Sequence, residues 1–188
     1  QGRADYAFWQ HILSSMDPKT GRCAILFPHG VLFRDEEQEM RQCIVEADLI
    51  EAVIGLGPNL FYNSPMESCI VICRSKKPAK RSGKVLFIDA VNEVTRERAQ
   101  SFLTPEHIDR VVSAFQAFDS EEGFAAVETL GAIADRSGNL SIPLYVTRRN
   151  DGADHDLEGS IAAWRQSAVE LRTAAENLFD HFDAGVSQ

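Results

Sequence analysis

The sequence predicts an α/β fold, and two observations carry that prediction. Several short segments are continuously apolar, which is typical of strands buried in a sheet, and turn residues separate them. Between and after these segments, apolar residues recur three and four positions apart, which is typical of amphipathic helices. The length of 188 residues suits one domain, and 44% hydrophobic residues suffice for a core.

In the first half of the chain, helices and strands are expected to alternate. An apolar face from Tyr6 to Leu13 predicts a helix, which the turn residues after Asp17 end. Residues 23–27 are continuously apolar up to Pro28, which predicts a parallel strand covered on both faces. Asp35 and Gln38 resemble a capping box, and the apolar stripe after them predicts a helix to about Ala47. Apolar runs predict further strands at 49–56, 68–74 and 85–90, the first two separated by the breaker Gly57-Pro58-Asn59.

The second half is expected to be more helical. Thr104-Pro105 is typical of a helix start, and Ile108, Val111 and Phe115 follow on one face. The pattern then predicts a short strand at 123–127, a short helix at 130–135 and an extended segment at 139–146. We therefore expect a compact region over 1–146, a polar linker over 147–156 and a helix over 157–188.

The last helix carries a heptad pattern, because its apolar residues alternate spacings of three and four over three heptads. Such a narrow stripe predicts contact with a helix of a partner protein. The alternative is that the helix packs on its own domain. The residues expected to bind the partner are Ile161, Trp164, Leu171, Leu178 and Phe182, with Ala168 and Ala175 between them.

The charge is unevenly distributed along the chain. The net charge is −9, yet residues 74–84 carry six basic residues and no acidic one. Proline, serine and glycine make this basic segment a loop. The simpler interpretation is a solvated loop between strands, and the alternative is a phosphate-contacting loop beside the hairpin of segments 49–56 and 68–74. The residues expected to contact DNA are Lys76, Lys77, Lys80 and Arg81.

Other residue types exclude several classes of protein. The four cysteines lie in apolar segments and are expected to be buried free thiols in a reducing compartment, the cytoplasm. The five histidines show no metal-binding spacing, so no metal is expected. The longest apolar runs, such as Cys69–Cys73, are much shorter than a membrane-spanning helix requires, so no membrane span is expected. Because the sequence lacks an initial Met and a leader, we expect an excised part of a longer protein.

An ordered set of motifs resembles one known family. It is first evident at Pro28-His29-Gly30-Val31-Leu32-Phe33-Arg34 and also runs through segments 4–8, 52–62, 85–90, 103–108 and 139–146. With these segments in this order, the chain resembles the modification subunit of type I restriction-modification systems. Departures from the family pattern are His29, where the family usually has Asp, and Leu144, where it commonly has Arg.

The resemblance implies a DNA adenine-N6 methyltransferase that uses S-adenosylmethionine. It implies the second half of a Rossmann-like sheet with an antiparallel C-terminal hairpin, in which 23–27, 49–56 and 68–74 are the fifth, sixth and reversed seventh strands. The partners it implies are DNA, the specificity subunit and the restriction subunit. Neither the Gly-rich cofactor loop nor the Asn-Pro-Pro-aromatic motif occurs in these 188 residues. The chain alone is therefore expected to be inactive.

The resemblance also implies roles for three aromatic residues. Phe61 matches the family position that stacks on the adenine flipped out of DNA, and Tyr62 is a weaker alternative. Phe8 matches an aromatic residue that packs on the adenine ring of the cofactor. The alternative for Phe61 and Phe8 is ordinary core packing.

Two other functions compete with a catalytic part. One is a non-catalytic interaction module that binds the specificity subunit, and the other is a generic Rossmann-like domain with a different ligand. The ordered motif set favours the methyltransferase over the generic domain.

Overall fold

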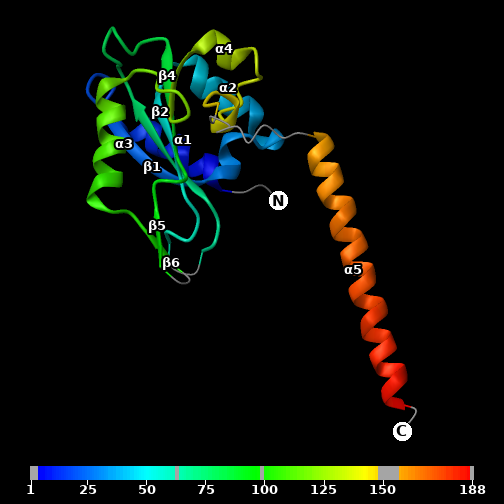
Figure 1. Cartoon of the computed structure of the whole chain (residues 1–188). Helices are drawn as coiled ribbons and strands as arrows, with labels where there is room; N and C mark the ends of the chain where they lie inside the picture. Colours follow the sequence, from blue (N-terminus) through cyan, green and yellow to red (C-terminus); the bar gives the residue numbers. More distant parts are fainter. Residues whose placement is uncertain (1–3, 62–63, 98–99, 148–156, 187–188) are drawn as a thin grey trace. The chain divides into compact units, whose positions relative to one another are not determined.

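The computed structural model describes residues 4–61, 64–97, 100–147 and 157–186 (Figure 1). The chain divides into two compact units, residues 1–148 and 149–188. The elements follow one another as α1 (Asp5–Ser15), β1 (Arg22–Pro28), the 3₁₀ turns η1 (His29–Leu32) and η2 (Asp35–Glu37), α2 (Gln38–Glu46), β2 (Ile50–Leu56), β3 (Ser68–Arg74), β4 (Lys84–Ala90), β5 (Thr95–Glu97), β6 (Gln100–Phe102), α3 (Pro105–Ala117), β7 (Ala125–Thr129), α4 (Leu130–Ala134), the 3₁₀ turn η3 (Ile142–Leu144) and α5 (Leu157–Val186).

Five strands form one sheet in the order β1-β3-β2-β4-β7. Strand β3 is antiparallel to both β1 and β2, so β1 and β2 run in the same direction. Strand β4 is parallel to β2, and β7 is antiparallel to β4. The α/β class and the reversed strand at 68–74 are thus confirmed. Because β1, β2 and β4 share one direction, their carboxyl ends meet at one edge of the sheet.

Strand β1 lies at the edge of the sheet and pairs only with β3 among the described strands. Its residues alternate between exposed and partly buried, and Leu26 remains 48% exposed. The expectation that this strand is covered on both faces was wrong. Its run of apolar residues indicates burial, but in the described chain no helix covers the face that bears Leu26, and the outer edge has no neighbouring strand.

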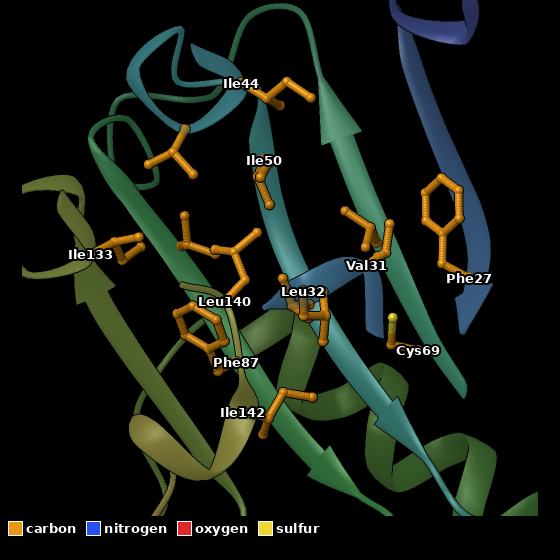
Figure 2. Close-up of a cluster of buried hydrophobic side chains, with 14 of the residues drawn as sticks. Phe27, Val31, Leu32, Ile44, Ile50, Cys69, Phe87, Ile133, Leu140 and Ile142 are labelled. Atoms are coloured by element: carbon orange, nitrogen blue, oxygen red, sulfur yellow. The ribbon is translucent and has the colours of Figure 1, made fainter. Parts of the chain in front are cut away.

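Both faces of the sheet bear a hydrophobic core because strand side chains alternate between faces. One core combines Val53, Val71 and Phe87 with residues of α1, α2, α4 and η3 (Figure 2). The other combines Ile54 and Ile88 with residues of α3 and the segment after it. The sheet is therefore the middle layer of three.

The sequence predicts side-chain caps at the starts of two helices, and one of the two forms. Thr104 caps α3 as expected: its hydroxyl accepts from the N–H of His107, and His107 Nδ1 accepts from the N–H of Thr104. The capping box predicted at Asp35 does not form. Residues 35–37 wind as a 3₁₀ turn, and Arg34 binds the Glu37 carboxylate, so α2 starts at Gln38 without a side-chain cap.

Three segments differ from expectation. Residues 139–146 are not extended: they contain the turn η3, which buries Ile142 and stacks Tyr145 on Phe87 at 4.1 Å between ring centroids. The hairpin of β5 and β6 was not predicted, since each strand has only three residues. The predicted strand at 123–127 forms two residues later, as β7, where it pairs with β4.

The second unit contains α5, a helix of 30 residues. Among the described residues, no helix has both the length and the apolar composition needed to cross a bilayer.

Candidate functional site at the carboxyl edge of the sheet

Two adjoining hollows lie where β1 ends and β3 begins. The larger, about 740 Å³, is lined by polar and charged residues that include Asp5, His29 and Glu67. The smaller, about 170 Å³, is mainly apolar and is lined by Leu26 and Phe61 among others. The hollows share Pro28, Met66 and Glu67. Ligands of open α/β sheets bind at this edge, so the hollows form the candidate site.

Phe61 lines the smaller hollow from the loop after β2. The carbonyl oxygen of Phe61 accepts a hydrogen bond from the Ser64 N–H at 3.1 Å, which folds the loop back on itself. The Phe61 side chain is 38% exposed, so the aromatic ring is not part of a closed core. The ring is available to a planar ligand, and Tyr62 lies outside the described residues.

His29 separates the larger hollow from the sheet. Its Nδ1 lies 3.5 Å from the Glu67 carboxylate, while its Nε2 is buried with no hydrogen-bond partner among the described residues. A Cβ at Gly55 would lie 3.6 Å from Nε2 and 2.8 Å from Ile142 Cδ1, so glycine makes room here. Burial lowers the pKa of His29 although Glu67 opposes the shift, and the imidazole is therefore neutral at neutral pH.

Arg34 lines the larger hollow and is held in place by two ion pairs. Its guanidinium binds Asp5 of α1 at 2.8 Å and Glu37 at 3.1 Å. These ion pairs tie α1 to the segment that follows β1. Sequence analysis missed both Glu67 and Arg34 as site residues, because their role depends on segments distant in sequence.

Phe8 does not line either hollow. It lies on α1 with its side chain 65% exposed, whereas Tyr6 and Trp9 of the same helix are buried. Core packing thus does not explain Phe8, and its ring faces solvent in the described chain.

The basic segment lies at the opposite edge of the sheet from the hollows. It joins the end of β3 to the start of β4, whereas Phe61 and His29 follow the ends of β2 and β1. A strand of seven residues separates the two edges by about 20 Å. The expectation that the basic segment lies near the loop of Phe61 was therefore wrong, since neighbours in sequence are separated here by the length of β3.

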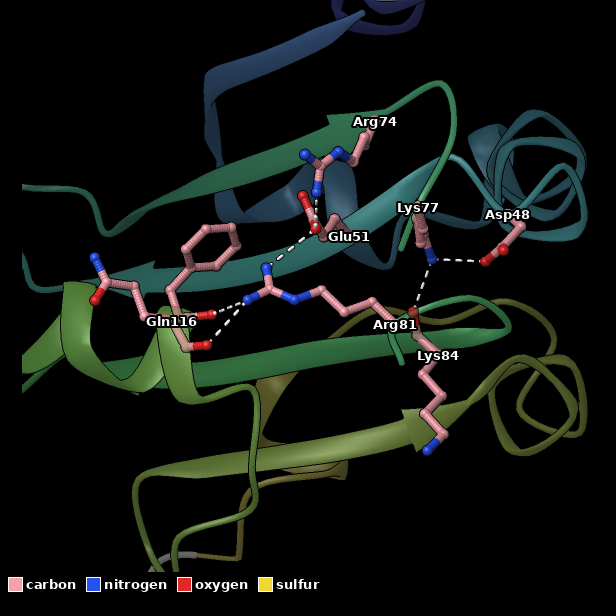
Figure 3. Close-up of polar contacts among 8 residues, drawn as sticks. Asp48, Glu51, Arg74, Lys77, Arg81, Lys84 and Gln116 are labelled. Atoms are coloured by element: carbon pink, nitrogen blue, oxygen red, sulfur yellow. Dashed lines mark hydrogen bonds and ion pairs between the residues drawn. The ribbon is translucent and has the colours of Figure 1, made fainter. Parts of the chain in front are cut away.

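Lys77 and Arg81 are used inside the fold, which corrects their predicted DNA-binding role (Figure 3). The Lys77 side chain is 1% exposed, and its ammonium binds Asp48 at 2.6 Å and the carbonyl oxygen of Lys84 at 2.7 Å. The Arg81 guanidinium binds Glu51 at 3.1 Å and two carbonyl oxygens at the end of α3. The Lys77 charge is paired and buried, and the Arg81 charge is paired and partly buried, so both are engaged within the fold. A charged residue inside an apolar strand, Glu51, was the sequence signal for this network.

The remaining lysines of the basic segment are free of such contacts. Lys76, Lys80 and Lys84 are exposed and form no ion pair with the described residues. If the segment contacts phosphate, these side chains carry that contact.

Where the structure describes its side chains, the heptad stripe of α5 is largely exposed. Ile161, Trp164 and Leu171 are 41%, 72% and 73% exposed. The side chains of Leu178 and Phe182 lie outside the described residues.

Comparison with known protein families shows to which family the chain belongs. Residues 1–154 match the family described as N-6 DNA Methylase. The chain belongs to this family. Among its relatives are two type I restriction enzyme methylase subunits of Methanocaldococcus jannaschii, MjaVIII and MjaVII, each 35% identical to this N-6 DNA methylase chain. The alignments cover 82% and 96% of this chain but 27% and 31% of the relatives, so the chain spans about a third of their length.

Solved structures agree with this assignment. The methyltransferase subunit of a type I restriction-modification system from Streptococcus thermophilus is 34% identical, with a TM-score of 0.72 over 77% of this chain and 30% of that subunit. The EcoKI M protein is 17% identical with a TM-score of 0.61, which shows the fold. The Rossmann-like fold predicted from the resemblance is confirmed.

Membership of a methyltransferase family implies S-adenosylmethionine, and the described residues do not make a site for it. Phe8 offers one exposed aromatic face, but it lines neither hollow. Asp5, one turn away, is already paired with Arg34. In the described part of the chain, no group of three His, Cys, Asp or Glu side chains could hold a metal ion.

Proposed function

We propose that this N-6 DNA methylase chain is part of the modification subunit of a type I restriction-modification system. Such a subunit transfers a methyl group from S-adenosylmethionine to adenine N6 in DNA. The observation that supports a role in this reaction is Phe61, an exposed aromatic ring on an apolar hollow at the ligand-binding edge of the sheet. The names of the relatives support the type of system.

In this proposal the chain supplies the adenine side of the site. A base that reacts at N6 has to leave the DNA stack, and an aromatic face replaces part of the lost stacking. Phe61 offers that face, and Leu26 and Met66 enclose the same hollow. Tyr62 remains the weaker alternative.

The cofactor side is proposed to come from the rest of the subunit. The chain spans about a third of its curated relatives, and the outer edge of β1 has no neighbouring strand in the described chain. We infer that the Gly-rich loop and the Asn-Pro-Pro-aromatic motif lie in that remainder, and that Phe8 packs on the cofactor only there. The chain alone is expected not to methylate DNA, because it lacks both the loop that binds the methyl donor and the motif that accepts hydrogen bonds from adenine N6.

The proposed partners are DNA and the specificity and restriction subunits of the type I complex, and the proposed location is the cytoplasm. One neighbouring structure was solved to explain complex assembly of a type I system. The exposed apolar stripe on α5 supports a helix of the specificity subunit as its partner. A non-catalytic interaction module would use the same stripe, so only methyl transfer by the complete subunit separates these two functions.

Phe61→Ala in the complete subunit is expected to lower kcat by roughly 5- to 150-fold, the equivalent of about 1 to 3 kcal/mol of stacking. Affinity for S-adenosylmethionine should stay unchanged, because the cofactor binds elsewhere. Single-turnover methylation and isothermal titration of the cofactor measure the two effects.

Phe61→Trp is the conservative control, since it keeps an aromatic face and should retain most of the activity. Phe33→Ala removes a ring of similar exposure that lines neither hollow, so it should change kcat little. Wild-type turnover in Phe61→Ala would reject the stacking role.

Replacing Lys76 and Lys80 by glutamine is expected to reduce the slope of log K against log salt for DNA binding by about 1.8, since each lost phosphate contact removes about 0.9. The charge-preserving pair Lys76→Arg and Lys80→Arg should keep the slope. Fluorescence anisotropy of DNA bound to the assembled complex, at several salt concentrations, measures this slope. An unchanged slope in the glutamine variant would mean that the basic segment is a solvated loop.

A further inference from the structure

Two cysteines face one another across the edge of the sheet. Cys23 lies in β1 and Cys73 in β3, and the antiparallel register makes them directly opposed residues. Directly opposed residues of antiparallel strands have Cβ atoms about 4.5 to 5.5 Å apart or closer, near the spacing that a disulfide requires. Their side chains lie on the face covered by α1.

The two thiols already contact each other. A hydrogen bond joins them, and it lowers the pKa of Cys23 while it raises that of Cys73. Burial raises the pKa of Cys73 further. The thiolate is the nucleophile in disulfide exchange, so Cys23 is the attacking group and Cys73 the one that closes the bond.

Solvent exposure also favours Cys23 over Cys73 as the attacking thiol. Cys23 is partly exposed on the edge strand, whereas Cys73 is fully buried. Cys69 is also buried, but its cross-strand neighbours are Phe27 and Gly55, so the register does not oppose it to another cysteine. Cys43 is exposed, contrary to the expectation of four buried thiols, but it lies on α2 and not in the β1–β3 pair.

We propose that Cys23 and Cys73 form a reversible disulfide when the protein meets a small-molecule disulfide such as oxidised glutathione. The Cys23 thiolate attacks one sulfur of oxidised glutathione, which forms a mixed disulfide and releases one glutathione thiolate that takes up a proton. Cys73 then gives up its proton, and its sulfur attacks the Cys23 sulfur and releases the second glutathione. The protein loses two hydrogens, and one oxidised glutathione becomes two reduced molecules.

The bond would tie the edge strand to its only described neighbour. It closes a loop of about 50 residues that includes His29, Phe61 and Glu67 of the candidate site. Closing a loop of that length restricts the unfolded chain and holds the β1 edge against β3. The proposal stands apart from the proposed function, because it needs neither DNA nor S-adenosylmethionine.

The test uses the full 188-residue chain with Cys43→Ser, which removes the exposed thiol and prevents cross-linking between molecules. Incubation with oxidised glutathione should lower the number of free thiols from three to one. Mass spectrometry should then detect a disulfide-linked peptide that contains Cys23 and Cys73. The oxidised chain should melt roughly 5 to 15 °C higher, and dithiothreitol should reverse the shift. Persistence of all three thiols, or a stable glutathione adduct on Cys23 without closure, would overturn the proposal.

Trp9 provides a second readout that needs no cysteine substitution in the pair. Trp9 is buried beside Cys73, and disulfides quench neighbouring indoles. With Trp164→Phe, Trp9 is the remaining tryptophan, so its emission should fall on oxidation and recover on reduction. Cys23→Ser should abolish both the quenching and the melting shift. Quenching that persists in Cys23→Ser would place the oxidation elsewhere and contradict the proposal.

Discussion

Glu51→Ala is expected to lower the free energy of unfolding of the compact unit by about 3 to 5 kcal/mol, the usual loss when one partner of a buried ion pair is removed. Glu51 is 1% exposed and its carboxylate binds both Arg74 and Arg81 at 3.1 Å (Figure 3). Both guanidiniums are largely buried and would keep their charge without the carboxylate that compensates it. The effect is expected to be large because one substitution leaves two guanidinium groups without their counter-ion.

The measurement is urea unfolding monitored by circular dichroism in the isolated chain. Glu46→Ala is the matched control, since Glu46 is exposed on α2 and forms no ion pair with the described residues, and it should change stability by less than about 0.5 kcal/mol. Glu51→Gln should lie between the two, because an amide still accepts hydrogen bonds from the arginines. If Glu51→Ala and Glu46→Ala unfold at the same urea concentration, the network does not stabilise the fold.

Replacing Leu171 and Leu178 together by aspartate is expected to weaken binding to the specificity subunit by roughly 100-fold or more. Two charges would be buried in an apolar interface without partners, and each such burial costs several kcal/mol. Leu171 is 73% exposed in the described chain, so the substitution does not disturb a core there. Co-purification of the tagged subunits, followed by isothermal titration, measures the loss.

Gln166→Asp with Thr173→Asp is the matched control, because these positions lie on the face of α5 opposite the heptad stripe. The control should bind like the wild type. Equal binding of the stripe variant would show that the apolar stripe is not the interface, and α5 would then have to pack within its own subunit.

The elements that depend on local pattern were predicted well. The apolar runs placed β2, β3 and β4 to within a residue, and Thr104 marked the start of α3. The prediction failed at Asp35, where Arg34 engages Glu37 and no side-chain cap forms. It also failed at residues 139–146, where burial of Ile142 and stacking of Tyr145 favour a 3₁₀ turn over an extended segment.

The candidate site was predicted only in part. Phe61 was found from its place after an apolar strand in a family-like motif, and it lines a hollow. His29 with Glu67 was not found, since the pair joins the end of β1 to the start of β3. The four basic residues 76, 77, 80 and 81 are indistinguishable by sequence, yet two of them form ion pairs within the fold.

By itself, the sequence determined the α/β class and the heptad stripe, because both depend on residue order and spacing alone. The ordered motifs also indicated the family, and the reversed strand followed from that resemblance. Only the tertiary structure decided which charges are free, because that depends on which acidic residues fold against them. It also decided that the basic segment and Phe61 lie at opposite edges of the sheet, since a reversed strand carries the chain from one edge to the other. It brought Cys23 and Cys73, about 50 residues apart, into direct opposition, because antiparallel register pairs residues irrespective of their separation in the chain.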